Sequence, residues 1–390
     1  MERTNLLRTP LHKFHVEHGG KMVDFAGWEM PILYSAPGAG IIAEHIQCRT
    51  SGGLFDVSHM GRVAIKGRHA RRLLERVCTR RISDMQTGQC RYSLACNEQG
   101  GVHDDIIVYR MDDDDFLVVV NASNRAKMLA HFEKVRTSGD LVCKIEDRTE
   151  STAMVAIQGP KVMDLISKMS REIPTLKRYR FAVKNLVFLK IIVSRTGYTG
   201  EDGVEVILPA NMVGMALGMI LKDAGLDKEG GLIRPCGLGA RDSLRLEAGM
   251  PLYGHELGED INALACGVDF AIALDKDTAE LGEPFIGQEA LKRTRDAGGP
   301  PRKMVGLALE GKRTARQGMK VKLGGAGGGR EVGIVSSACL SPTLGFPIAM
   351  AFIDKDACAE GTAIEVDTGK DSVIPGKVAK LPFYNPTRGK

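Results

Sequence analysis

The sequence has no apolar run approaching the length of a membrane span, and its N-terminus lacks the apolar core of a secretory signal. A spanning helix needs about 20 predominantly apolar residues, so we expect no membrane association. The nine cysteines are odd in number and none forms a CxxC pair. That pattern disfavours a disulfide framework or a structural zinc site, and it favours a reducing compartment.

A strong excess of charge of one sign is also missing. Lys and Arg number 53 and Asp and Glu number 48, which gives a net charge of +5, and the basic residues are scattered. This balance falls well short of the profile of a nucleic-acid-binding protein. It still favours anionic small ligands or an acidic partner protein.

The chain lacks the glycine pattern of a dinucleotide-binding fold as well. Gly237-Leu238-Gly239 opens a predicted helix, but no third glycine stands at the required position. The glycine-rich stretch 324–330 leads into a predicted strand, so we expect a hairpin loop there and no phosphate cradle. Because strands and helices do not alternate repeatedly, the sequence also argues against a doubly wound fold.

What is present predicts an α+β protein with antiparallel sheets flanked by helices. The 390 residues suggest two or three domains, and we place three units at 1–141, 142–280 and 281–390, of which the first two can interleave. From about residue 302 the chain shows short strands separated by turns, which is typical of a small barrel or jelly roll. Residues 185–195 are predicted as one strand.

Three histidines, His12, His15 and His18, are spaced three residues apart in a predicted helix. On a helix this spacing spreads them along one side, which makes a metal site conceivable. No carboxylate or cysteine completes a ligand set at an obvious spacing. We therefore expect a solvated helix face here.

The stretch GGVHDDIIVY, from Gly100 to Tyr109, is the first candidate for chemistry. Two glycines predict a turn, and the β-branched run that follows predicts a strand. Asp104 and Asp105 thus stand where a loop enters a sheet, and their side chains point to opposite faces. An ordinary hairpin turn with solvated acids is the alternative for this stretch taken alone.

Several such stretches together resemble the aminomethyltransferase, or T-protein, family of the glycine cleavage system. The matching motifs follow one another in the family's order from about residue 10 to the end of the chain. They are MVDFAGWEMP, FDVSHM, GGVHDDIIVY, VVNAS, AIQGP, GYTGEDGVE, PCGLGARDSLRLEAGMPLYG, FIGQEAL and SPTLG.

The resemblance implies three domains in a ring-like cloverleaf, with tetrahydrofolate in the central hole and the first domain binding folate. It also implies the reaction. The lipoyl arm of the partner H-protein carries an aminomethyl group, whose carbon passes to tetrahydrofolate. Methylene-tetrahydrofolate, ammonia and the dihydrolipoyl H-protein are the products, and no metal is required.

Site residues follow from the same match. Asp105 takes the place of the carboxylate that orients the reacting nitrogen or accepts a proton, and its neighbour Asp104 ranks second. Glu205 matches the buried acceptor of the pterin N–H groups. Tyr198 is expected to border the pterin, and Arg241 to pair with a carboxylate.

Further residues match positions that line the folate pocket in relatives of the family. These are Met60, Tyr92, Val119 and Asn121, with Arg388 in the tail expected near the glutamate end of folate. Taken alone, each of these residues can also be interpreted as purely structural. Methionine, for example, is so often a core residue.

Two alternatives stay open beside the enzyme. Related folate-binding units end the dimethylglycine and sarcosine oxidoreductases, but those proteins need an upstream flavin domain that this chain has no room for. The other alternative is a non-catalytic folate-binding protein acting in iron–sulfur protein assembly. For the enzyme we expect a monomer, in the mitochondrial matrix of a eukaryote or the cytoplasm of a bacterium.

Overall fold

The computed structural model describes residues 6–35, 40–186, 189–221, 231–324, 329–369 and 372–386. The chain divides into two compact units, and each takes in separate segments of the sequence. Unit 1 comprises residues 1–71, 85–91 and 106–242, and unit 2 comprises residues 72–84, 92–105 and 243–390. The three-domain division stays a prediction.

Unit 1 is built around a six-stranded sheet of order β11-β12-β13-β10-β4-β14, in which all pairs are antiparallel except β4 and β14. A three-stranded sheet of order β1-β3-β2 belongs to the same unit. The strands are β1 (Leu7–Arg8), β2 (Gly20–Phe25), β3 (Trp28–Tyr34), β4 (Gly53–Asp56), β10 (Thr152–Gln158), β11 (Phe181–Leu186), β12 (Leu189–Ser194), β13 (Gly203–Pro209) and β14 (Arg234–Pro235).

A five-stranded sheet of order β6-β7-β8-β5-β9 completes the strands before the barrel. Its strands are β5 (Gly61–Lys66), β6 (Cys90–Cys96), β7 (Val102–Asp112), β8 (Asp115–Val120) and β9 (Lys144–Asp147). A tight turn within the acidic run 112–115 joins β7 to β8, since β7 ends at Asp112 and β8 begins at Asp115.

Helices connect these strands. The α-helices are α1 (His12–Glu17), α2 (Ile41–Thr50), α3 (Ala70–Val77), α4 (Arg125–Ser138), α5 (Val162–Ser167), α6 (Val213–Leu221), α7 (Leu238–Glu247) and α8 (Gln288–Asp296). Short 3-10 helices are η1 (Ala122–Asn124), η2 (Ile173–Thr175), η3 (Ala210–Met212), η4 (Ala263–Ala265), η5 (Asp269–Ala271), η6 (Lys276–Thr278) and η7 (Lys355–Ala357). Among the described residues, no helix has both the length and the apolar character needed to cross a membrane.

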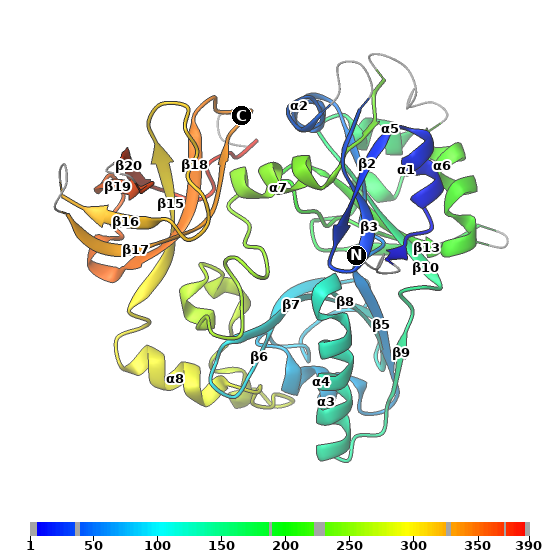
Figure 1. Cartoon of the computed structure of the whole chain (residues 1–390). Coiled ribbons are helices and arrows are strands. Elements are labelled where there is room, and N and C mark those ends of the chain that lie inside the picture. Colours follow the sequence, from blue (N-terminus) through cyan, green and yellow to red (C-terminus); the bar gives the residue numbers. More distant parts are fainter. Residues whose placement is uncertain are drawn as a thin grey trace. The chain divides into compact units, whose positions relative to one another are not determined.

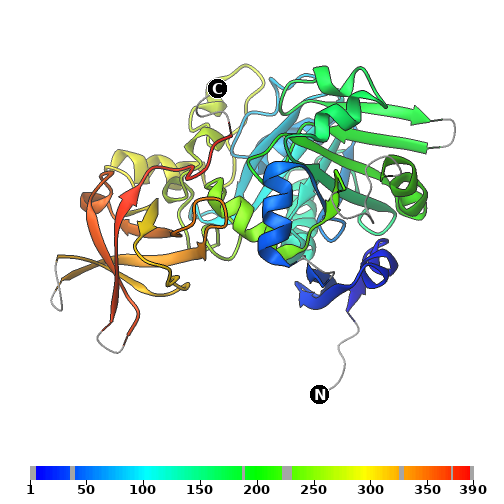
Figure 2. The same ribbon diagram turned by 90° about the horizontal axis from the view of Figure 1, so that it is seen from above.

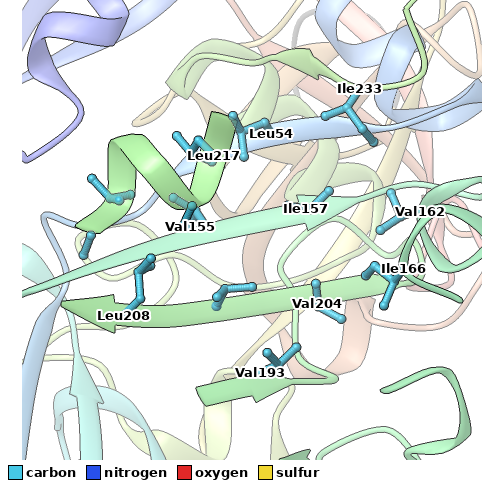
Figure 3. Packing of buried hydrophobic residues seen from close by; sticks show 14 of the residues in the cluster. Leu54, Val155, Ile157, Val162, Ile166, Val193, Val204, Leu208, Leu217 and Ile233 are labelled. Atoms are coloured by element: carbon cyan, nitrogen blue, oxygen red, sulfur yellow. The ribbon is translucent and has the colours of Figure 1, made fainter. Parts of the chain in front are cut away.

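The core of the six-stranded sheet fixes where its polar side chains point. Val204 and Leu208 on β13, with Val155 on the neighbouring β10, pack on one face against residues of α5 and α6 (Figure 3). Because side chains along a strand alternate between faces, Glu205 points to the face opposite this core. Its strand partner in the β10–β13 register is Ala156.

The C-terminal part of unit 2 is a closed antiparallel barrel of order β15-β18-β17-β16-β19-β20, coloured yellow to red in Figures 1 and 2. Its strands are β15 (Arg302–Leu309), β16 (Lys320–Leu323), β17 (Arg330–Leu340), β18 (Pro347–Asp354), β19 (Ala363–Asp367) and β20 (Val373–Ala379). The predicted α+β class and the C-terminal barrel are both confirmed. A closed barrel leaves no unpaired strand edge.

Two local predictions are wrong. Residues 185–195 do not form one strand, because β11 and β12 pair antiparallel with Leu186 opposite Leu189. No glycine or proline marks the change of direction in this apolar stretch. The helix α1 also does not present a solvated row of histidines, since His15 is only 1% exposed.

Burial of His15 has a clear cause in its hydrogen bonds. Its Nε2 lies 2.9 Å from Asp56 Oδ2, and its Nδ1 lies 2.8 Å from Tyr34 Oη. Both ring nitrogens are therefore satisfied inside the protein, which offsets the cost of removing the imidazole from water. His12, by contrast, pairs with Glu29 at 2.9 Å.

Candidate functional site

Glu205 is a buried carboxylate on the face of the sheet away from the apolar core. Its side chain is 5% exposed as part of β13, and the Thr196 hydroxyl donates a hydrogen bond to Oε2. Burial raises the pKa of Glu205, and this effect is opposed by the Thr196 hydrogen bond and the positive charge of Arg241. The site therefore combines a desolvated acid with the groups that favour its charged form.

Arg241 and Tyr198 lie beside this carboxylate. The Arg241 guanidinium carbon is 4.7 Å from the centre of the Tyr198 ring, an arrangement that stabilises a cation over an aromatic face. Arg241 Nη1 is buried and has no hydrogen-bond partner among the described residues. An unsatisfied buried donor is costly, so this nitrogen suits the acceptor of a bound molecule.

The start of α7 places Arg241. A Cβ atom at Gly237 would lie 2.4 Å from the Ile32 carbonyl oxygen, so only glycine permits this close approach to β3. Burial lowers the pKa of Arg241, and the Glu205 carboxylate counteracts it. Glu205, Arg241 and Tyr198, three residues named from the sequence, are thus brought together in unit 1.

The loop that carries Tyr198 is held by residues that the sequence reasoning did not select. Arg49 pairs with Glu201 at 2.9 Å and donates to the Thr199 carbonyl at 2.7 Å. Gln158, in the AIQGP motif, donates from Nε2 to the carbonyls of Thr196 and Val204. The only sequence signal for these contacts was the motif itself, because Arg49 and Glu201 stand 152 residues apart.

Asp105 lies in unit 2, with Tyr92. The Tyr92 hydroxyl donates to Asp105 Oδ2 at 3.2 Å, and the Tyr92 ring lies 5.9 Å from the Phe270 ring. Asp105 is partly exposed whereas Asp104 is fully buried at 0% exposure. This difference agrees with the predicted alternation of the two side chains across β7.

The remaining predicted pocket residues are more varied in environment. Met60 is partly exposed, and its carbonyl accepts a hydrogen bond from Arg62. Val119 on β8 is 3% exposed, and Asn121 precedes η1. Arg388 lies outside the described residues. A binding role for these four stays a prediction.

His59, in the FDVSHM motif, is a buried imidazole 2% exposed. Burial lowers its pKa to about 4, with Arg241 and Arg62 acting in the same direction and Asp56 opposing them. Its Nδ1 has no hydrogen-bond partner among the residues described. The ring is therefore neutral at pH 7 and resists protonation until the pH is low.

We expect this histidine to destabilise the folded protein in acid. As the pH falls from 6.5 towards 4, the unfolded chain binds a proton at His59 and the folded chain does not, so folding weakens. The effect amounts to about 3 kcal/mol at its limit. Urea unfolding of wild type and His59→Asn at pH 7 and about pH 4 measures it, and equal pH dependence in both proteins would contradict it.

All nine cysteines are free thiols, and burial raises the pKa of Cys48 to about 12. Within the described ranges, no group of three or more His, Cys, Asp or Glu side chains is arranged to hold a metal ion.

These observations define a class of protein: a mixed α+β chain with a C-terminal antiparallel barrel and a buried glutamate near a half-buried arginine and tyrosine. Two family models match this chain. The GCVT N-terminal domain covers residues 11–276, and the glycine cleavage T-protein C-terminal barrel domain covers residues 302–385. The chain belongs to the glycine cleavage T-protein family.

Individual relatives support the same family assignment. The aminomethyltransferase of Rubrobacter xylanophilus is 46% identical over 388 residues, which cover 99% of this chain and 96% of that relative. The aminomethyltransferase of Saccharopolyspora erythraea is 40% identical over 379 residues, covering 97% and 98%. The crystal structure of the glycine cleavage system aminomethyltransferase T from Bartonella henselae aligns with a TM-score of 0.86 and 29% identity, over 97% of this chain and 98% of that one. The family predicted from the motifs is confirmed.

Proposed function

We propose that the protein transfers the methylene carbon of an aminomethyl group from the lipoyl arm of H-protein to tetrahydrofolate. The bonds of this carbon to the arm sulfur and to its own amino nitrogen break, and it forms bonds to two nitrogens of tetrahydrofolate, whose two N–H protons end on the thiol and the ammonia. Ammonia and the dihydrolipoyl thiol are released. The family and its aminomethyltransferase members support this reaction class.

The observation that carries the proposal is the placement of a buried carboxylate, Glu205, near the guanidinium of Arg241, which itself lies over the Tyr198 ring. Glu205 Oε2 accepts a hydrogen bond from the Thr196 hydroxyl, and a carboxylate has a second oxygen that can accept from a ligand N–H. Arg241 Nη1 is buried and has no hydrogen-bond partner among the described residues. Tetrahydrofolate carries a ring edge with amino and N–H donors for a carboxylate, and acceptors for a guanidinium.

Asp105 is assigned the chemistry at the reacting nitrogen, with Tyr92 orienting its carboxylate. A partly exposed carboxylate can stabilise positive charge as it develops, or take a proton. Tetrahydrofolate supplies the nucleophile, so the protein itself needs to bind, orient and balance charge. No Ser-His-Asp arrangement or reactive thiol is required.

The test combines turnover with binding. Purified protein is incubated with aminomethyl-loaded H-protein, and ammonia release is followed with and without tetrahydrofolate. We expect rapid release only with folate. We also expect tetrahydrofolate alone to raise the unfolding temperature, because a ligand at 100 times its Kd stabilises the native state by about 2.7 kcal/mol.

The same experiment separates the alternatives. Stabilisation by folate without ammonia release would support the non-catalytic iron–sulfur assembly protein, which the relatives named above do not favour. If tetrahydrofolate caused neither stabilisation nor ammonia release, this result would contradict folate binding. Because those relatives are bacterial, we favour the cytoplasm over the mitochondrial matrix, and we propose that the protein is a monomer.

A further inference from the structure

A chain of buried hydroxyl groups runs through unit 1 and ends at Glu205. Tyr109 Oη lies 3.1 Å from Ser194 Oγ, and Ser194 Oγ lies 2.7 Å from Thr196 Oγ1, which donates to Glu205 Oε2. These four side chains are at most 6% exposed. They come from three strands, β7, β12 and β13, and from the loop that follows β12.

Hydrogen counting gives this chain a direction when Glu205 is ionised. An ionised carboxylate has no proton to donate, so Thr196 must be the donor to it. The single hydroxyl hydrogen of Thr196 is then used, and Ser194 must donate to Thr196. The hydrogen of Ser194 is used in turn, so Tyr109 must donate to Ser194.

The alternative bond of Ser194 is weaker. Its hydroxyl can also reach the Glu205 backbone carbonyl, but at 3.3 Å against 2.7 Å to Thr196. The terminal donor also stays protonated, since burial raises the pKa of Tyr109 well above its ordinary value and the thiol of Cys90 and the Glu205 carboxylate add to that effect. The direction from Tyr109 to Glu205 is therefore consistent with the three hydrogen bonds that link these four side chains.

We propose that Tyr109, Ser194 and Thr196 are positioning residues that hold Glu205 as an ionised acceptor and leave its Oε1 free for a ligand N–H. The proposal rests on the proposed function for the identity of the ligand, tetrahydrofolate. Its geometry does not depend on that identity. A chain of this kind selects molecules with an N–H donor edge and rejects those that present an acceptor there.

Other groups near the Glu205 carboxylate also affect whether it is ionised. Arg241 from α7 favours the charged form, whereas burial favours the neutral form. Cys90 on β6 is also buried, and burial together with the Glu205 charge raises the pKa of its thiol, which stays neutral. Removing a donor from the chain should raise the pKa of Glu205, so ligand affinity should be lost at a higher pH on acidification.

The experiment measures the Kd for tetrahydrofolate by anaerobic calorimetry between about pH 5 and pH 8. This range lies above the ordinary carboxyl pKa, where a buried carboxyl with a raised pKa titrates. Thr196→Val removes the direct donor to Glu205, and we expect a Kd about ten- to a hundredfold higher with the acid limb moved to higher pH. Ser194→Ala and Tyr109→Phe should have progressively smaller effects in the same direction. Thr196→Ser restores the hydroxyl and should restore both affinity and pH profile.

Two control variants distinguish loss of the hydroxyl chain from general effects on folding. Thr294→Val on α8 removes a hydroxyl that donates to the Ala290 carbonyl, and Tyr179→Phe removes a phenol hydroxyl from a tyrosine that is 44% exposed. Both should bind folate as wild type does. Thr196→Ser and Tyr109→Phe are close in shape to the native residues, so the test survives if Thr196→Val fails to fold.

A second readout is independent of folate. The ¹³C signal of the Glu205 carboxyl, identified by its absence in Glu205→Gln, reports the pKa of Glu205 in the free protein. A higher pKa in Thr196→Val, reversed in Thr196→Ser, supports the proposal even if wild type binds no folate, which would overturn only the proposed function. Unchanged pKa and affinity in folded variants, or an effect confined to Thr196, would overturn the hydroxyl chain.

Discussion

Asp105→Asn is expected to lower the rate constant of folate-dependent ammonia release by about 10²- to 10⁴-fold, the range typical for loss of a general acid–base group. Asparagine keeps the size and the hydrogen-bonding oxygen that faces the Tyr92 hydroxyl, 3.2 Å away in the native protein. It loses the charge and the ability to accept a proton. The loss should therefore appear in turnover and leave the affinity for tetrahydrofolate nearly unchanged.

The neighbouring residue supplies the matched control. Asp104 differs by one position on β7 and is fully buried, so Asp104→Asn changes the hydrogen bonding of the interior. We expect this variant to lose about 1–3 kcal/mol of stability and to keep most of its turnover at a temperature where it is folded. Asp105→Asn, at a partly exposed position, should unfold close to the wild-type temperature.

The two variants together decide between the carboxylates. Rapid ammonia release by Asp105→Asn would move the chemistry away from that residue, and a collapse of turnover in folded Asp104→Asn would assign it to the buried neighbour. A pH profile of Tyr92→Phe adds a further measurement. If Tyr92 positions Asp105, removing its hydroxyl should raise the pKa that limits turnover in acid.

Much of the fold could be predicted because its signals are local. Alternation of side chains along a strand placed Asp104 and Asp105 on opposite faces of β7, and turn residues separated the six strands of the barrel. These patterns depend on neighbours a few residues away. The antiparallel pairing of β11 with β12 was missed because no glycine or proline separates Leu186 from Leu189 in this apolar stretch.

The site was predictable only where a motif marked it. Glu205, Arg241 and Tyr198 each stand in a family motif, and the structure brings them together. The groups that support them are separated by long stretches of sequence. His15 meets Asp56 across 41 residues, and Tyr109 meets Ser194 across 85. Such pairs are set by sheet register and packing, which no local pattern encodes.

Lys276→Met is expected to reduce the free energy of unfolding by about 3–5 kcal/mol, because it leaves a buried charge without its partner. Lys276 Nζ lies 2.6 Å from Glu75 Oε2, and both side chains are 0% exposed. The three ammonium hydrogens are directed to the carbonyls of Glu75, Cys78 and Arg80 at 2.6, 2.7 and 2.9 Å. The cation thus also satisfies the C-terminal end of α3, where positive charge is favoured.

Matched variants separate the buried charge from the lost side chain. Lys292→Met removes an ammonium that pairs with Asp277 and Glu289 near the surface, and we expect a change of at most about 1 kcal/mol. Lys276→Met combined with Glu75→Gln removes both charges, while the introduced amide keeps an oxygen for the backbone N–H groups of Ile82 and Ser83 that Glu75 accepts from. If the uncompensated carboxylate causes the loss, the double variant should be more stable than Lys276→Met alone. Urea unfolding of all four proteins gives the comparison. Equal stability of Lys276→Met and Lys292→Met would show that solvent reaches the Glu75 carboxylate and that the ion pair contributes no more than one at the surface.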